Sequence, residues 1–272
     1  MTTEKTARPR GLITGASSGI GAAFADRFAR DQYDLVIVAR RRDRLEDLAR
    51  HLESRYSIRV EVIVADLTRP ADLRAVEERV AGDTALELLI NNAGFGAYMP
   101  FVALDPDRAE ELIHLQVVAV TRLTRAALTG LIERGRGAII NVSSLLAFSA
   151  ALPAPPLPKR ATYAAAKAYV NTFTRILHSE LQGTGVQVQA LCTGRVRTEF
   201  HRIQGMDPDS FPANTVMTPE DVVEASLAGL RMGEVLCVPA LDDPSLLLSI
   251  EESQRRLLEH GLSGTLAKRY VP

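Results

Sequence analysis

Short apolar runs alternate along the chain with longer stretches in which apolar residues recur at helical spacing. The apolar runs lie at 11–14, 34–39, 60–65, 86–90, 138–142, 186–192 and 235–238. The helical stretches lie at 22–30, 45–56, 73–80, 109–134, 163–181 and 219–232. Strand and helix in regular alternation predict an α/β fold, a Rossmann-like doubly wound parallel sheet of about seven strands with helices on both faces.

Nothing in the pattern divides the chain, so we expect a single domain over residues 1–272. Two segments interrupt the alternation. Residues 150–160 form a proline-rich insertion, and residues 199–216 are polar and carry glycine and proline. Long loops at the carboxyl ends of parallel strands are where such folds bind substrates, so 199–216 is a candidate lid. Residues 245–258 are expected to form one more amphipathic helix.

Composition narrows the class of partner. The 32 Lys and Arg residues balance 33 Asp and Glu residues, and the net charge of -1 gives no positive field for nucleic acid. We find no apolar run of the ~18 residues that a membrane span needs. Cys192 and Cys237 lie in separate apolar runs without ligand spacing, which predicts no metal site, no disulfide and a reduced cytoplasmic protein.

A glycine-rich turn follows the first apolar run, where residues 14–21 read TGASSGIG, and a helical pattern begins at once. Glycines let the backbone turn sharply and approach a pyrophosphate, whose charge then lies at the positive end of a helix. A turn of this composition can also be only a turn. Its position between strand and helix favours a dinucleotide site.

Three arginines follow the second expected strand. Dinucleotide folds place an acidic residue there to bind the adenosine ribose, but this chain has Ala39 followed by Arg40, Arg41 and Arg42. An arginine at this place can bind a 2′-phosphate, which indicates NADP(H). A solvated basic helix start is the alternative.

Two further polar positions follow the third and fourth expected strands. Asp66 is a candidate contact for the adenine amino group or, alternatively, a cap for the next helix. The segment 91–94, reading NNAG, is small and polar where backbone must pass a cofactor, although it also suits an ordinary turn.

Tyr163 and Lys167 stand four residues apart in a stretch of helical pattern, so both side chains project from one helix face. A nearby ammonium favours the phenolate and so lowers the pKa of a phenol from its usual ~10. Ser143 and Ser144 end the fifth expected strand at the same sheet edge, where a hydroxyl can bind a substrate carbonyl.

The order of these motifs resembles that of the short-chain dehydrogenase/reductase family in its common single-domain form, and the resemblance covers almost the whole chain. It rests on the turn 15–21, the segment 91–94, the serine after strand five, the Tyr163/Lys167 pair and the loop 194–198.

The resemblance implies that Tyr163 is the proton donor in carbonyl reduction, that Lys167 holds the nicotinamide ribose and lowers the tyrosine pKa, and that Ser144 polarises the substrate oxygen, with Ser143 as the alternative. Thr198 would bind the nicotinamide carboxamide. The implied cofactor contacts are Gly15, Ser17, Ser18, Gly19, Ile20, Gly21, Arg40, Arg41, Asp66, Leu67, Asn92, Ala93, Gly94, Tyr163, Lys167, Gly194, Val196 and Thr198.

The chain departs from the family pattern at three places. Gln116 stands where the family often has a relay asparagine, and Thr193 replaces the proline before Gly194. The interval from Ser144 to Tyr163 is longer than usual because of the proline-rich insertion, which lines the substrate entrance or is a surface excursion.

The function expected from these observations is NADP(H)-dependent reduction of a ketone or aldehyde, or oxidation of the matching alcohol. The alternative is a non-catalytic dinucleotide-binding sensor or scaffold with the same fold. A nucleic-acid binder using residues 40–44 is a third reading, weakened by the interruption at Asp43.

The expected substrate is a medium-sized apolar carbonyl compound. Candidate pocket residues are Phe95, Tyr98, Met99, Leu145, Leu146, Phe200, His201, Ile203 and Met206. The resemblance also implies a homodimer or homotetramer that pairs the helices at 109–134 and 163–181.

Overall fold

The computed structural model describes residues 8–207 and 210–271. They belong to two compact units, Met1–Pro239 and Ala240–Pro272, which are described separately. The end residues 1–7 and 272 of the expected domain, and residues 208–209 of the expected lid, lie outside the described residues.

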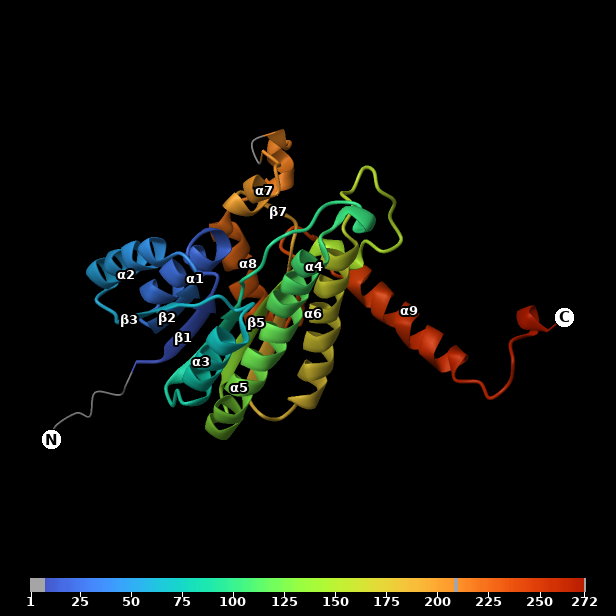
Figure 1. The fold of residues 1–272 in the computed structure, drawn as a ribbon. Helices are drawn as coiled ribbons and strands as arrows, with labels where there is room; N and C mark the ends of the chain where they lie inside the picture. Colours follow the sequence, from blue (N-terminus) through green and yellow to red (C-terminus); the bar gives the residue numbers. More distant parts are fainter. Residues whose placement is uncertain (1–7, 208–209, 272) are drawn as a thin grey trace. The chain divides into compact units, whose positions relative to one another are not determined.

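The first unit is built on a parallel seven-stranded sheet in the order β3-β2-β1-β4-β5-β6-β9 (Figure 1). Its strands are β1 (Arg10–Thr14), β2 (Asp34–Ala39), β3 (Val60–Val64), β4 (Leu86–Asn91), β5 (Gly137–Ser144), β6 (Val186–Thr193) and β9 (Leu236–Cys237). This confirms the predicted fold class. The strand order reverses between β1 and β4, and sheets of this kind bind ligands at such a point, beyond the carboxyl ends of the strands.

Helices cover both faces of the sheet, as Figure 1 shows. The helices of this unit are α1 (Gly19–Arg30), α2 (Arg42–Tyr56), α3 (Pro70–Ala81), α4 (Pro106–Ile113), α5 (Ala119–Arg134), α6 (Ala161–Glu180), α7 (Glu199–Ile203) and α8 (Pro219–Met232). A π-helical turn, His114–Val118, joins α4 to α5. Two short strands, β7 (Arg195–Val196) and β8 (Val216–Met217), pair beside α7 and were not expected.

Alternation along the strands creates two apolar cores. In β2, Leu35 and Ile37 pack into the core shared with α1, α2 and α8, whereas Val36 and Val38 pack into the core shared with α3, α5 and α6. Successive strand side chains point to opposite faces, so a strand buried on both faces needs a continuous apolar run. That is why these strands are legible in the sequence.

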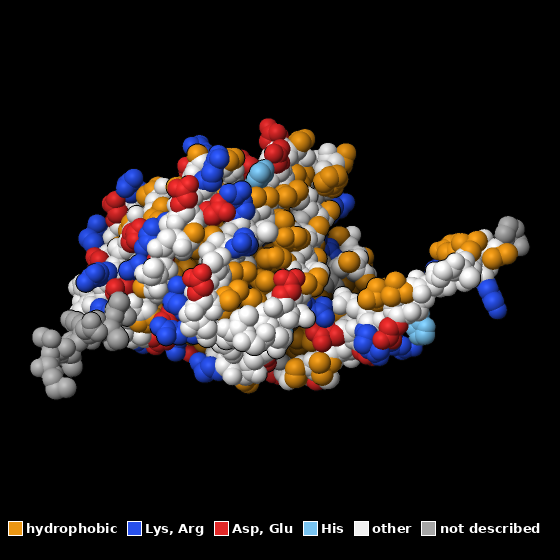
Figure 2. All heavy atoms as spheres, turned by 90° about the horizontal axis from the view of Figure 1, so that it is seen from below, with side chains coloured by type: hydrophobic (Ala, Val, Ile, Leu, Met, Phe, Trp, Pro, Cys, Tyr) orange, Lys and Arg blue, Asp and Glu red, His pale blue; other side chains and the backbone are white. Residues whose placement is uncertain are grey.

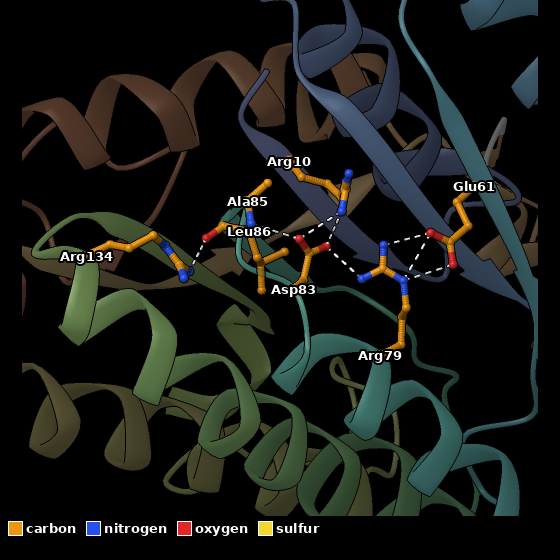
Figure 3. A network of polar contacts seen from close by, with 7 residues as sticks. All are labelled: Arg10, Glu61, Arg79, Asp83, Ala85, Leu86 and Arg134. Carbon is orange, nitrogen blue, oxygen red and sulfur yellow. Dashed lines mark hydrogen bonds and ion pairs between the residues drawn. The ribbon is translucent and has the colours of Figure 1, made fainter. Parts of the chain in front are cut away.

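The amino-terminal edge of the sheet is fastened by a buried carboxylate. Figure 3 shows Asp83, just before β4, between Arg10 of β1 and Arg79 of α3. The Asp83 oxygens accept from Arg10 Nη1 at 2.8 and 2.9 Å, from Arg79 Nη1 at 2.7 Å and from the Ala85 amide at 3.0 Å. Burial opposes ionisation of Asp83, but its hydrogen bonds from Arg10 and Arg79 outweigh that effect and lower its pKa. Glu61 extends the network by binding Arg79.

The stretch Pro106–Arg134 is long and apolar enough to cross a membrane by length and composition, which the sequence reading missed. Buried residues of α5, among them Leu123, Ala127 and Leu131, belong to the core beneath the sheet. This packing accounts for much of the apolar character of the stretch.

The second unit contains one long helix, α9 (Ser245–Gly261), and a short turn, Lys268–Tyr270. Its apolar side chains are exposed, as Figure 2 shows along this segment, among them Leu246, Leu248, Leu257 and Leu258. All the candidate site residues named from the sequence lie in the first unit.

Candidate active site

The glycine turn after β1 has a shape that only glycine permits. Gly15 has φ +68°, and a Cβ there would lie 2.8 Å from the Ala93 Cα. A Cβ on Gly21 would lie 2.4 Å from the Gly15 carbonyl oxygen. Helix α1 begins at Gly19, and no side chain caps its first amides. This leaves a glycine-lined cradle with free N–H groups, which suits the pyrophosphate of a dinucleotide.

The loop after β4 is locked to this turn. Thr14 Oγ1 accepts from the amides of Asn92 at 3.0 Å and Ala93 at 3.1 Å. The Asn92 side chain donates to the carbonyls of Thr14 at 3.0 Å and Gly15 at 3.1 Å. The neighbouring Asn91 instead points into the sheet, where it donates to Asn141 Oδ1 at 2.9 Å. Asn92 therefore shapes the cofactor cradle, while Asn91 fastens β4 to β5.

Among the arginines after β2, the one directed at the glycine turn is Arg41. Its Nη2 donates to Ser18 Oγ at 2.7 Å and to Ser17 Oγ at 2.9 Å. Arg40 lies instead toward Asp66, with 3.9 Å between Nη1 and Oδ2. Arg41 is therefore the better-placed candidate for a 2′-phosphate beside the turn.

Asp66 and Leu67 make local contacts after β3. Asp66 Oδ1 accepts from the Thr68 amide at 3.1 Å and from Thr68 Oγ1 at 2.8 Å. The cap of α3 is Arg69, so the alternative that Asp66 caps this helix is wrong, and its contact with the adenine stays a prediction. The Leu67 side chain is buried in the core beneath the sheet, which leaves only its backbone for a cofactor contact.

Tyr163 and Lys167 lie on one face of α6, and both are buried. Lys167 Nζ lies 5.8 Å from the centre of the Tyr163 ring and donates to the Val142 carbonyl at 2.8 Å. Burial lowers the pKa of Lys167 to about 8. Burial also raises the pKa of Tyr163, although its hydrogen bonding with Ser144 and Tyr98 acts in the opposite direction. The net shift of the Tyr163 pKa is therefore upward, because burial outweighs the lowering expected from the ammonium.

The structure separates the two serines that end β5. Ser144 is the one beside Tyr163, whose pKa it lowers by hydrogen bonding. Ser143 donates to Asn171 Oδ1 at 2.6 Å, inside the contact between β5 and α6. Neighbouring strand residues point to opposite faces, so only one of the two serines can face the site.

Gln116 lies in the π-helical turn and is completely buried. Its Nε2 donates to the Phe95 carbonyl at 2.6 Å, and among the described residues its Oε1 has no hydrogen-bond partner. Gly94 passes close by, since a Cβ there would lie 3.5 Å from Gln116 Cδ. The buried acceptor next to the cofactor loop fits a bound water or hydroxyl group.

Aromatic side chains gather around Tyr163. Its ring centre lies 5.2 Å from that of Tyr98 and 6.0 Å from that of Phe200 on α7. Phe95, Tyr98, Leu146 and Phe200 pack in one cluster with Tyr163. His201 is partly buried and stacks edge-on with Phe211, and burial lowers its pKa. Of the other expected pocket residues, Met99, Leu145 and Ile203 are exposed and Met206 is partly buried.

The base of the lid touches the glycine turn. A Cβ on Gly19 would lie 2.8 Å from Thr198 Cγ2, so the two segments are in close contact. Val196 is buried in the core that α1 shares. Among the described residues, a Cβ on Gly194 would meet only Leu145 Cδ1, at an ordinary contact distance of 3.5 Å. Of these three, Thr198 is the residue placed at the cradle.

Arg160, which the sequence reading overlooked, organises the proline-rich insertion. It is buried and donates to Ser149 Oγ at 2.6 Å, to the Ser149 carbonyl at 2.7 Å and to the Leu152 carbonyl at 2.9 Å. A lone arginine at the end of a loop gives no sequence signal for this role. The insertion is therefore tied down just before the helix that carries Tyr163.

The residues described so far form one site at the carboxyl edge of the sheet. A cradle for a dinucleotide adjoins a buried hydroxyl, phenol and ammonium, a set able to exchange a proton with a substrate oxygen. Within residues 8–207 and 210–271, no cluster of three or more His, Cys, Asp or Glu side chains could hold a metal ion.

Two known proteins with similar sequences are reductases by their names. The chain is 32% identical over 237 residues to a very-long-chain 3-oxoacyl-CoA reductase of Anas platyrhynchos, covering 84% of this chain and 71% of that protein. It is 36% identical over 222 residues to sulfoacetaldehyde reductase 2 of Chromohalobacter salexigens, covering 78% of this chain and 84% of that one.

Solved structures agree on the fold. A short-chain dehydrogenase from Sphingobium yanoikuyae in complex with NADPH superposes with a TM-score of 0.90 at 38% identity, covering 97% of this chain and 100% of that one. A bulky-bulky ketone specific alcohol dehydrogenase from Comamonas testosteroni gives a TM-score of 0.87 at 35% identity, covering 97% and 99%. The sequence profile of the short chain dehydrogenase family matches residues 11–207, and the chain belongs to this family of oxidoreductases.

Proposed function

We propose that the protein is an NADP(H)-dependent carbonyl reductase and alcohol dehydrogenase in which Tyr163 is the acid/base. The observation that carries the proposal is the burial of Ser144, Tyr163 and Lys167 at one place beside the glycine cradle. Buried ionisable groups with shifted pKa values are typical of catalytic sites.

The residues present fit a dinucleotide. The lack of a Cβ at Gly15 and Gly21 lets the turn 15–21 pack against the loop after β4. The first amides of α1 have no side-chain cap and can bind a pyrophosphate. Arg41, Ser17 and Ser18 offer donors for a 2′-phosphate at the side of that turn. The bound cofactor supplies or accepts the hydride, and the protein provides orientation and the proton.

In the reduction direction, Ser144 and Tyr163 hold the substrate carbonyl oxygen. Tyr163 gives its proton to this oxygen as negative charge develops there, which leaves a phenolate. The Lys167 ammonium stabilises that phenolate, and the dry surroundings strengthen the interaction. In oxidation the phenolate takes the proton from the alcohol.

The aromatic cluster favours an apolar substrate. Tyr98, Phe200 and Leu146 pack around Tyr163, and the relative from Comamonas testosteroni acts on bulky ketones by its name. A ketone or aldehyde of medium size is the proposed substrate class.

Faces of α5 and α6 carry exposed apolar side chains, Ile132 and Ile176 among them. We propose that these helices pair with a second copy of the chain. Light scattering on the purified protein measures the mass in solution, and a monomer at all concentrations would exclude this pairing.

The test is a binding titration with NADPH and NADH followed by turnover on a panel of ketones and aldehydes. Tyr163→Phe should lower kcat/KM by roughly a thousandfold and leave the Kd for NADPH nearly unchanged, because it removes only the proton donor. Tyr169→Phe is the matched control. The Tyr169 hydroxyl is on the same helix but forms its hydrogen bond with Thr121 Oγ1, at 2.8 Å, and does not belong to the cluster around Tyr163.

Three outcomes separate the alternatives. Binding with turnover that depends on Tyr163 supports the enzyme. NADPH binding without turnover on any substrate favours a dinucleotide sensor. Near-normal turnover by Tyr163→Phe contradicts the assignment of the acid/base.

A further inference from the structure

Glu199, the first residue of the lid helix α7, is ion-paired with two arginines of the cofactor side. Its Oε2 lies 2.7 Å from Arg41 Nη1, and its Oε1 lies 3.0 Å from Arg44 Nη1. Residues 41 and 199 are 158 positions apart in the chain, so the contact joins two separate regions. The hydrogen bond from Arg41 lowers the pKa of Glu199, which keeps the carboxylate ionised.

Four of the five N–H donors of Arg41 are engaged within the protein. Nε and Nη2 donate to Ser17 Oγ at 3.2 and 2.9 Å, Nη2 also donates to Ser18 Oγ at 2.7 Å, and Nη1 donates to Glu199. A guanidinium has five N–H groups in a fixed fork and binds a phosphate by presenting one edge of that fork. A phosphate that binds one edge of this fork therefore displaces a present partner of Arg41, or it lies close to the Glu199 carboxylate, which is a second anion.

We propose that Glu199 competes with the 2′-phosphate of NADP(H) for Arg41, so that it sets the preference between the two nicotinamide cofactors and couples phosphate binding to release of α7. This inference rests on the proposed function, because it takes Arg41 as the phosphate-binding residue.

Release of Glu199 affects the surroundings of Tyr163, because the next residue packs near it. Phe200, the next residue, lies 6.0 Å from Tyr163 between ring centres and 6.3 Å from Tyr98. Helix α7 has only five residues, so movement of its first residue moves the aromatic side chain that covers Tyr163. NADH carries no 2′-phosphate and leaves the contact between Glu199 and Arg41 in place.

The decisive variant is Glu199→Gln, which removes the negative charge and keeps the size of the side chain. It should tighten NADPH about fivefold and change NADH less than about twofold. The effect is modest because Arg41 and Glu199 are partly exposed, with 42% and 36% of their side chains accessible, and salt should reduce it. The measured quantity is the ratio of the two dissociation constants.

Two variants serve as controls. Glu46→Gln removes a carboxylate that pairs with Arg42 at 3.4 Å, in the same arginine cluster but away from Arg41, and should leave the ratio near its original value. Arg41→Ala should weaken NADPH far more than NADH. If Arg41→Ala leaves the ratio unchanged, the proposed cofactor assignment fails.

If Arg41→Ala changes the ratio and Glu199→Gln does not, the competition is absent and this inference alone is overturned. Equal weakening of both cofactors by Glu199→Gln also overturns it, because Glu199 would then hold the lid closed over any dinucleotide.

A fluorescent reporter tests the coupling to the lid. The sequence contains no tryptophan, so Ile203→Trp on α7, at a site 67% exposed, introduces the chain's single one. Its emission should change with NADP⁺ but not with NAD⁺, and the double variant with Glu199→Gln should show the changed emission before nucleotide is added. Equal responses to both nucleotides would overturn the coupling.

Discussion

A charged side chain is buried at each end of the strands, and the two differ in how many partners bind the charge. At the amino-terminal edge, Asp83 accepts hydrogen bonds from two arginines and a backbone amide. At the carboxyl-terminal edge, Lys167 donates to a single carbonyl and faces the Tyr163 ring. Among residues 8–207 and 210–271, no carboxylate forms an ion pair with it.

The difference shows where this fold places stability and where it places reactivity. A buried charge with a full set of partners holds elements together, and removing one partner is costly. A buried charge with few partners lies higher in free energy and titrates near neutral pH, which a proton-transfer site requires. The same sheet provides the framework for both.

Asp83→Asn should have the largest effect on stability. It removes the carboxylate that Arg10 and Arg79 share and leaves Arg79 with Glu61 alone, and we expect a loss of about 3 kcal/mol in the free energy of unfolding. Urea unfolding followed by circular dichroism measures it. Asp47→Asn is the control, because Asp47 pairs with Arg50 on the surface, where 71% of its side chain is exposed. Equal effects of the two variants would remove the contrast between the edges.

Lys167→Met should act in the opposite direction and stabilise the protein by about 1–2 kcal/mol at pH 7. The folded-state pKa of about 8 lies below the ordinary 10.5, so the folded chain binds this proton more weakly than the unfolded chain. The gain should shrink as the pH rises from about 8 to 10.5, where Lys167 is neutral in both states. Turnover should fall at least a hundredfold. If Lys167→Met lowers both stability and activity, burial of the Lys167 ammonium does not destabilise the folded protein.

Acid should remove the contribution of Asp83. Its folded-state pKa is lowered, so its stabilisation is complete above the ordinary value of 3.8 and is lost as the pH falls through the folded-state pKa. The difference in unfolding free energy between the parent protein and Asp83→Asn should therefore narrow in this range. A difference that is constant with pH would mean that ionisation of Asp83 is not what fastens this edge.

The smallest effect is expected from Arg160→Gln, at the carboxyl edge. Its bonds hold only the loop from Ser149 to Pro158, so global stability should change by about 1 kcal/mol or less. Hydrogen exchange should nevertheless accelerate in residues 150–160. Unchanged exchange there would show that the loop is held by other contacts.

The framework was largely predictable from sequence because the signals for it are local. The runs at 34–39 and 219–232 coincide with β2 and α8 to the residue, since each is a continuous or periodic apolar pattern with clear ends. The glycine turn was equally predictable, because the positions that require glycine lie within a few residues of one another. The ends of most other elements differ from the predicted bounds by one to three residues: α1 begins three residues earlier, whereas β3 and β9 are shorter than predicted.

The features that the sequence did not reveal depend on partners far along the chain. The choice of Arg41 over Arg40 follows from the positions of Ser17 and Glu199. By contrast, Ser144 was already preferred to Ser143 from the resemblance, and strand parity, which a one-residue shift in register reverses, accounts for that preference. The lid 199–216 was read as a loop, yet it begins with α7 and ends at the start of β8, which pairs with β7 just before the lid. These elements are too short to produce a periodic pattern.

Alkylation of the two buried cysteines can report local unfolding of the sheet. Burial raises the pKa of both Cys192 in β6 and Cys237 in β9 to about 12, and only a thiolate reacts readily with alkylating reagents. Both thiols thus stay silent in the closed molecule and become reactive when these strands separate. The rate of labelling at each cysteine counts the opening events of this side of the sheet, and any thiol engineered elsewhere on the surface can be modified without background from the interior.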